Sequence, residues 1–200
     1  GFSGDGNGVF NYSGSEKVSD LKAWIKENLQ KNLKLVATDL PFAVFLEKYK
    51  SMGGIVEEFL EGDIKESPSV QCRVTPTGDL EIISTHDQEL GGESGQVYFG
   101  AHFPAAVDYA VELGEMGLKV AAALKERGVL GRFAVDFISV KEKEGWKHFP
   151  IEINLRKGGT THPFLMLQFL TDGRYNIEDG KYYTSKGHLV RYYFCSDNLK

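Results

Sequence analysis

The sequence of 200 residues has few cysteines, no long apolar run and no excess of basic residues. Its two cysteines, Cys72 and Cys195, lie far apart and outside any paired-cysteine motif, which predicts two buried, reduced thiols and fits a reducing compartment such as the cytoplasm. No apolar stretch approaches the roughly 20 residues that span a bilayer, and no signal peptide opens the chain. The formal net charge of −5 disfavours nucleic-acid binding. We therefore expect a cytoplasmic protein without membrane or nucleic-acid partners.

The composition is that of an ordinary globular protein, with 42% hydrophobic and 26% charged residues. Hydrophobic periodicity, Pro and Gly then predict the elements of the chain. The expected helices are 17–33, one from Pro41 to the glycines at 53 and 54, one from Pro104 to Arg127–Gly128, and 163–170. The expected strands are 9–13, a buried one within 54–62, 69–75, 80–85, 132–140, 148–154 and 188–194, with a polar loop over 86–96. Most neighbouring strands form hairpins, which predicts an α+β fold with mainly antiparallel sheets.

The chain opens on a glycine-rich loop, "GFSGDGNGVF". The loop is not a Walker motif, because no Gly-Lys-Ser/Thr follows, and it fits neither G-x-G-x-x-G nor an EF-hand. Glycines at Gly4, Gly6 and Gly8 allow backbone N–H groups to form an anion-binding nest, to which Ser3 and Asn7 can add donors. A flexible hairpin turn explains the same residues, and the loop alone leaves both interpretations open.

Three oxygen-bearing side chains alternate with apolar residues in two neighbouring strands. Glu152 and Asn154 point to one face of their strand, because side chains of a strand alternate between faces. If the hairpin closes about Glu144 without a bulge, Asp136 lies opposite Glu152 on that same face. Two like charges in such positions destabilise a sheet, whereas two carboxylates and an amide oxygen suit Mg²⁺ or Mn²⁺. The alternative is an exposed face with solvated acids.

The segment after the second strand, "LRKGGTTHP", adds a cation and a histidine. Arg156 beside a metal face suits a phosphate or a carboxylate, although a surface arginine is an equal alternative. His162, directly before Pro163, is a candidate acid–base group or a structural loop histidine.

These pieces together resemble the ATP-grasp superfamily. The glycine loop, the segment "VEEFLEG" and a hairpin of the form "DF…EIN.R" carry the resemblance. The stretches 66–105 and 151–163 are similar to ATP-grasp peptide ligases of the pheganomycin type and to ATP-grasp regions of larger animal proteins. The likeness covers nearly the whole chain, and it implies an incomplete ATP-grasp fold with a small lobe at 1–60 and a large lobe at 61–200.

The resemblance implies a role for each candidate residue. An ATP-binding role falls on the phosphate loop and on the interlobe linker that meets adenine: Ser3, Gly4, Asp5, Gly6, Asn7 and Gly8, then Glu57, Glu58, Phe59 and Leu60. Asp63 or Glu66 would hold the ribose. Asp136, Glu152 and Asn154 fall on the family's Mg²⁺ ligands, and Arg156 on its phosphate-contacting cation. His86, Asp87 and Gln88 would lie in a loop over the acceptor substrate.

The function that the resemblance implies is an ATP-dependent carboxylate–amine ligase acting through an acyl phosphate, with ATP and Mg²⁺ (or Mn²⁺) as cofactors. Its partners would be small-molecule or peptide carboxylates and amines. The family carries a lysine strand and an N-terminal domain before the glycine loop, so we expect this chain to be a fragment that lacks them. The alternative is a non-catalytic nucleotide-binding or interaction module of a larger protein.

Overall fold

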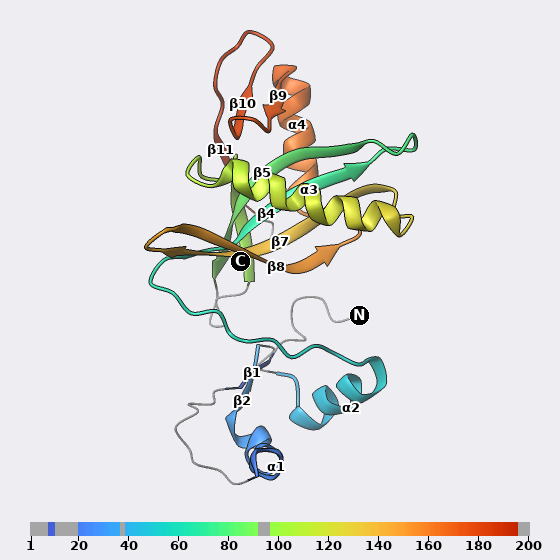
Figure 1. The fold of residues 1–200 in the computed structure, drawn as a ribbon, viewed down its shortest axis with the longest axis vertical. Helices are drawn as coiled ribbons and strands as arrows, with labels where there is room; N and C mark the ends of the chain where they lie inside the picture. Colours follow the sequence, from blue (N-terminus) through green and yellow to red (C-terminus); the bar gives the residue numbers. More distant parts are fainter. Residues whose placement is uncertain (1–7, 11–19, 37–38, 92–96, 196–200) are drawn as a thin grey trace. The chain divides into compact units, whose positions relative to one another are not determined.

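The computed structural model describes residues 8–10, 20–36, 39–91 and 97–195, without the side chains of residues 97, 194 and 195. The chain divides into two compact units between Phe59 and Leu60 (Figure 1). Within the described ranges, no helix has both the length and the apolar character needed to cross a bilayer.

The first unit contains a short antiparallel pair and two helices. Strands β1 (Gly8–Phe10) and β2 (Leu33–Leu35) pair with Val9 opposite Lys34. Helix α1 (Leu21–Asn32) begins where the Asp20 carboxylate accepts the Ala23 N–H at 3.1 Å, as an N-cap does.

Helix α2 (Phe42–Met52) has the ends that its sequence predicts. It follows Pro41 and ends at Gly53, whose φ of 74° favours glycine. The helix expected over 17–33 is confirmed as α1 within the described residues, whereas β2 was not anticipated.

The prediction of a buried strand within 54–62 is wrong. Residues 53–62 form no regular element, and Ile55 and Val56 are 74% and 90% exposed. The segment joins the two compact units, and no described strand pairs with it to satisfy its backbone groups. Apolar residues alone therefore did not indicate burial at this position.

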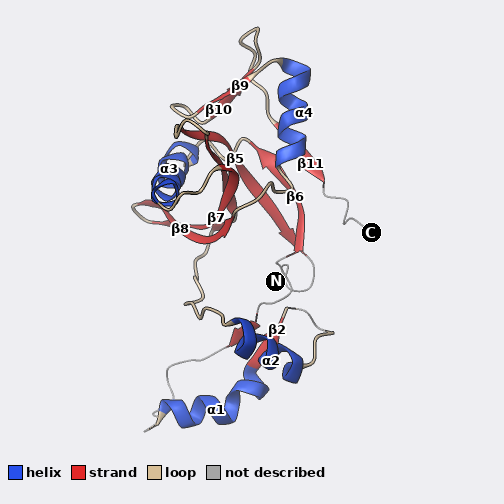
Figure 2. Ribbon diagram, turned by 90° about the vertical axis from the view of Figure 1, so that its right-hand side faces the viewer, coloured by secondary structure: helices blue, strands red, loops and turns tan. Residues whose placement is uncertain are grey.

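The second unit is built on one large antiparallel sheet in the order β11-β6-β5-β4-β7-β3, with β8 beside β7. Its strands are β3 (Lys65–Glu66), β4 (Pro68–Val74), β5 (Leu80–Gly91), β6 (Val97–Phe103), β7 (Gly131–Glu142), β8 (Gly145–Asn154) and β11 (Tyr192–Cys195). Helices α3 (Ala110–Glu126) and α4 (Thr161–Thr171) and a small pair, β9 (Arg174–Asn176) with β10 (Lys181–Tyr183), complete the unit (Figure 2).

Three expected boundaries in this unit are wrong. The last strand, expected over 188–194, covers Tyr192–Cys195. The polar loop expected from His86 is wrong, because β5 continues as a strand to Gly91. Asp87 and His86 pair with Pro68 and Ser69 of β4, and this pairing holds polar side chains within the sheet. The long helix expected from Pro104 begins at Ala110. Strands β3, β6, β9 and β10 were also missed, since they are short or carry no clear alternation.

Asp87 explains why the chain turns before α3. Its carboxylate accepts hydrogen bonds from the Ala106 N–H at 2.7 Å and from the Tyr109 hydroxyl at 2.6 Å. Burial raises the pKa of Asp87, and these two hydrogen bonds act against that rise. The carboxylate thus fixes the start of α3 against the sheet.

One face of the sheet packs against α3 and forms the main core. Val70, Cys72, Phe133 and Val135 are buried there, and burial raises the pKa of the Cys72 thiol to about 12. The predicted buried thiol is confirmed for Cys72, while the Cys195 side chain lies outside the described part of the structure. Gly117 of α3 allows the close approach, because a Cβ there would lie 2.6 Å from a Val70 methyl carbon.

A second, aromatic core contains a buried histidine. The His86 ring lies 5.0 Å from the ring of Phe103 and 6.4 Å from that of Phe164, centroid to centroid. His86 has no exposed surface, and neither ring nitrogen has a hydrogen-bond partner among the described residues. Burial therefore lowers the pKa of His86 to about 3.

Substitution of Gly117 by Val should destabilise the second unit. The new side chain meets Val70 in a filled core, and overpacking of this kind costs about 1–3 kcal/mol. Urea unfolding measures the loss, with Gly158→Ala as the control, because a Cβ at Gly158 has no neighbour within 4 Å. Equal stability of Gly117→Val and the wild type would contradict this packing of α3.

The buried His86 should make the fold sensitive to acid. In the folded state the pKa of His86, about 3, lies below the ordinary histidine value. The stability that comes from burying neutral His86 is therefore complete at neutral pH and is lost as pH falls toward 3. Between pH 7 and 5 the wild type should lose about 2 kcal/mol more than His86→Leu. The exposed His188, changed to Leu, provides the control. Parallel pH profiles for the wild type and His86→Leu would show that His86 is not buried in this way.

Candidate functional site

The β7–β8 hairpin has the register that the sequence predicts at the candidate metal ligands. Asp136 lies opposite Glu152, and Ala134 lies opposite Asn154. The route to that register differs from the expectation. The strands join through the two-residue turn 143–144 with Glu142 opposite Gly145, and a bulge between Asp136 and Phe137 then restores the expected pairing.

Asp136 is the most buried acid of this group and lies among polar side chains. Its Oδ2 accepts a hydrogen bond from the Asn154 amide at 3.0 Å, and Ser69 lies directly across on β4. Burial is the main cause that raises the pKa of Asp136, and the charge of Glu152 adds to it. Ser69, Arg156 and Asn154 lower that pKa but do not cancel the rise. The Asp136 carboxylate therefore favours a proton or a nearby cation.

The segment after β8 brings further groups to this face. The Arg156 N–H bonds to the Asn154 carbonyl at 2.7 Å, and its charge is felt at Asp136. The Gly158 N–H donates to the Thr161 hydroxyl at 3.1 Å, which shapes the loop before α4. His162 is exposed in the first turn of α4, and no contact among the described side chains links it to Asp136.

Tyr98 is a neighbour of the site that sequence reasoning missed. A Cβ at Gly159 would lie 3.3 Å from the Tyr98 ring, so the ring packs on this loop. Burial raises the pKa of Tyr98, and Tyr192 and Asp136 raise it further. Its buried hydroxyl has no hydrogen-bond partner among the described residues. Its strand, β6, carries no clear alternation and was not predicted, so no signal in the sequence indicated this position.

The candidate nucleotide residues are spread over both units. Ser3, Gly4, Asp5, Gly6 and Asn7 lie outside the described residues, and Gly8 begins β1. In the connection between units Glu57, Glu58 and Phe59 are exposed, and Leu60 is half-buried. Asp63 is exposed, whereas burial and then Asp87 raise the pKa of Glu66 in β3.

The candidate acceptor residues lie in β5 rather than in a loop. His86 has no exposed surface, so its side chain contacts no solute in this conformation. Both carboxylate oxygens of Asp87 bond to the chain before α3. Gln88 is half-buried, and its N–H donates to the Ser67 carbonyl at 3.0 Å.

At the hairpin, the oxygen-bearing side chains of Asp136, Glu152 and Asn154 lie together, and the charged side chain of Arg156 is nearby. Among the described residues no point gathers three or more His, Cys, Asp or Glu side chains. Two carboxylates and the Asn154 amide are nevertheless hard ligands, and Mg²⁺ commonly takes one or two carboxylates and completes its shell with water and phosphate oxygens. The residues present therefore fit Mg²⁺ held together with a phosphorylated ligand.

Comparison with known families and proteins gives a consistent result. The family described as "IQCH-like, ATP-grasp" matches residues 16–178. An L-propargylglycine–L-glutamate ligase from Streptantibioticus cattleyicolor is 34% identical over 153 residues, which are 76% of this chain and 30% of the ligase. IQ motif-containing protein H from Danio rerio is 23% identical over 142 residues, or 70% of this chain and 13% of that protein. The chain thus spans less than a third of either relative.

Solved structures show the same fold. Biotin carboxylase from Campylobacter jejuni, in a complex with an ATP ligand, matches with a TM-score of 0.50 and 16% identity, over 70% of this chain and 31% of that one. Pyruvate carboxylase from Rhizobium etli matches with a TM-score of 0.50 and 15% identity, over 68% and 12% of the two chains. The expected α+β fold with mainly antiparallel sheets is confirmed. The family match over most of the sequence shows that this chain belongs to the ATP-grasp family.

Proposed function

We propose that this chain is the nucleotide- and metal-binding part of an ATP-dependent ligase that joins a carboxylate to an amine. The observation that carries the proposal is the register of the β7–β8 hairpin, which sets Asp136 opposite Glu152 with Asn154 on the same face. Family membership supports ATP as the nucleotide. The name of the bacterial relative, an L-propargylglycine–L-glutamate ligase, supports amino acids as the substrate class.

Asp136, Glu152 and Asn154 are the residues that would hold Mg²⁺, or Mn²⁺ in its place. The raised pKa of Asp136 supports this assignment, because a divalent cation, like a proton, offsets the cost of burying the carboxylate charge and the repulsion from Glu152. Bound there, the ion would neutralise charge on the β- and γ-phosphates of ATP. The Asn154 amide orients Asp136 through the 3.0 Å hydrogen bond.

Other residues would bind the nucleotide. The glycine loop of Ser3 to Gly8 would cover the phosphates with its N–H groups, and Glu57 to Leu60 would meet the adenine through the backbone. Asp63 or Glu66 would hold the ribose. Arg156, whose charge lowers the pKa of Asp136, would contact the transferred phosphoryl group.

The reaction takes place in two steps. A carboxylate oxygen of the first substrate attacks the γ-phosphorus, the bond to the bridging oxygen breaks, and ADP leaves. The amine of the second substrate then attacks the acyl carbon, phosphate leaves, and the amine loses a proton to a base, for which the exposed His162 is the candidate. The protein contributes positioning and fixed charge rather than a covalent intermediate of its own.

Metal binding should be visible in stability, independently of turnover. With Mg·ADP at 100 times its dissociation constant, the unfolding free energy of the full-length protein should rise by about 2.7 kcal/mol. Asp136→Asn and Glu152→Gln should lose most of this gain. Without metal, Asp136→Asn should be at least as stable as the wild type, because the repulsion from Glu152 is removed. Thermal unfolding with and without Mg·ADP makes the measurement.

The control for this experiment is Asp172→Asn. Asp172 ends α4 with a φ of 45°, a conformation that Asn tolerates well, and it lies outside the hairpin. This variant should keep the full Mg·ADP effect. An equal Mg·ADP effect in Asp136→Asn, Glu152→Gln and the wild type would rule out the hairpin as the metal site.

Ligase activity should appear as phosphate release that requires both an amine and a carboxylate. In the full-length protein, a panel of amino acids and ATP should give ADP and phosphate in equal amounts, and Arg156→Gln should slow the reaction by at least tenfold through loss of transition-state charge stabilisation. A coupled phosphate assay makes the measurement. Binding of Mg·ATP without any substrate-dependent phosphate release would favour the non-catalytic nucleotide-binding module instead.

A further inference from the structure

A row of charged side chains crosses the sheet on the same face as the proposed metal site. Arg73 of β4 lies opposite Glu81 of β5 on one side and opposite Arg132 of β7 on the other. The β4–β7 pairing continues without a shift from Ser69 opposite Asp136 to the end of β4. Because side chains alternate along a strand, Arg132 and Asp136 point to the same face.

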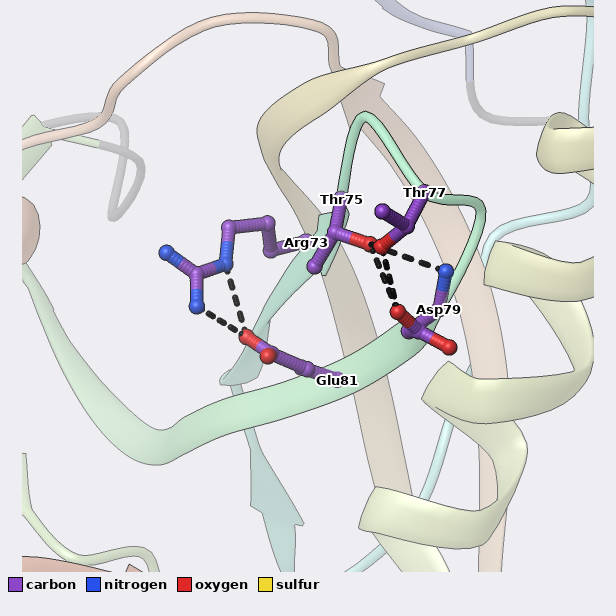
Figure 3. Close-up of polar contacts among 5 residues, drawn as sticks. All are labelled: Arg73, Thr75, Thr77, Asp79 and Glu81. Carbon is purple, nitrogen blue, oxygen red and sulfur yellow. Dashed lines mark hydrogen bonds and ion pairs between the residues drawn. The ribbon is translucent and has the colours of Figure 1, made fainter.

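The row holds two cations and one anion. The Arg73 guanidinium donates to Glu81 Oε2 from Nε at 2.7 Å and from a terminal nitrogen at 2.5 Å. Figure 3 shows that this ion pair is separate from the contacts at the hairpin tip, where the Asp79 carboxylate accepts hydrogen bonds from Thr75 and Thr77. Asp79 is therefore already engaged within its own turn.

Arg132 is left without a counter-ion in the described part of the chain. No described carboxylate lies within ion-pair distance of its guanidinium. Burial lowers the pKa of Arg132, Arg73 lowers it further, and Glu81 acts in the opposite direction. Like charges placed directly opposite each other destabilise a sheet, so an anion that contacts both arginines would relieve an existing repulsion.

The location of this row relative to the metal site indicates which part of the reaction it serves. Arg132 precedes Asp136 by four residues, or about 13 Å along the strand. At the other end of β7, Glu66 and Lys65 of β3 lie opposite Ser139 and Val140. Lys65 also donates to the Leu60 carbonyl at 3.2 Å, which ties β3 to the proposed adenine-binding segment.

The proposed nucleotide would therefore occupy the β3 end of the strand and place its phosphates at Asp136. The arginine row would lie beyond the phosphates, at the end of β7 that is away from β3. Between Asp136 and the arginine row lie three uncharged residues on the same face: Gln71, Ala134 and the proposed metal ligand Asn154, which pairs with Ala134. This placement of the nucleotide rests on the proposed function.

We propose that Arg73 and Arg132 bind a second carboxylate of the amino-acid substrate, one that takes no part in the reaction, so that the ligase selects an acidic amino acid. Guanidinium groups match the planar geometry of a carboxylate and donate paired hydrogen bonds to it. Glu81 holds Arg73 in place and leaves a net positive charge for the ligand. The distance of about 13 Å along the strand from Asp136, which lies opposite Glu152, leaves room for the transferred phosphoryl group and an amino acid in line.

The test is calorimetric titration of the full-length protein, saturated with Mg·ADP, with L-glutamate and with L-glutamine. The wild type should bind L-glutamate at least tenfold more tightly, since L-glutamine lacks the second carboxylate. Arg132→Gln should bind the two amino acids equally, and Arg132→Lys should retain part of the preference. The control Arg174→Gln changes an exposed arginine of β9 and should behave as the wild type.

Arg132→Gln should fold and bind Mg·ADP normally, because the substitution removes a charge that faces Arg73. Equal binding of both amino acids by the wild type, or no binding of either, would overturn the assignment of the arginine row. An unchanged preference in Arg132→Gln would overturn it as well. Loss of Mg·ADP binding in the wild type would instead refute the proposed function, so the two failures are distinguishable.

Discussion

The candidate site depends on one constraint, the register of two antiparallel strands that sets Asp136 against Glu152. Such a pair is unfavourable in a sheet by itself, and burial makes the charged form of Asp136 more costly. The bulge between Asp136 and Phe137 produces this pairing at the end of the hairpin, because it corrects a turn that would otherwise set the register one residue away. The local fold therefore maintains a charge repulsion that a cation can relieve.

The large sheet has two chemically different faces. On one face Val70, Phe133 and Val135 pack under α3, and Gly117 lets the helix approach closely. The other face alternates with these residues and carries Ser69, Gln71 and Arg73 of β4 and their neighbours on β7. Hydrocarbon packing on the first face fixes the strands, so the positions of polar groups on the second face follow from the core. Asp87 adds to this rigidity by fixing the start of α3.

Much of this architecture could be predicted from local patterns. Alternation in 132–140 and 148–154 predicted the hairpin, and Pro41 and Gly53 predicted the ends of α2. The arginine row was not predicted. Its residues, Arg73 and Arg132 with Glu81, come from three strands whose register is set by pairing rather than by local sequence. His86 was misplaced for a similar reason. Its polar segment reads as a loop, yet pairing with β4 and two aromatic rings buries it.

The sequence by itself determined the antiparallel α+β class and the β7–β8 hairpin, because both depend on short-range spacing along the chain, and its motifs carried the resemblance to the ATP-grasp superfamily. Only the tertiary structure decided that residues 54–59 are exposed, that β5 continues to Gly91, and that the Asp87 carboxylate fixes the start of α3. These features depend on which distant segments lie alongside a given stretch. Burial, hydrogen-bond satisfaction and the pairing of charges are properties of those neighbours, and local sequence does not contain them.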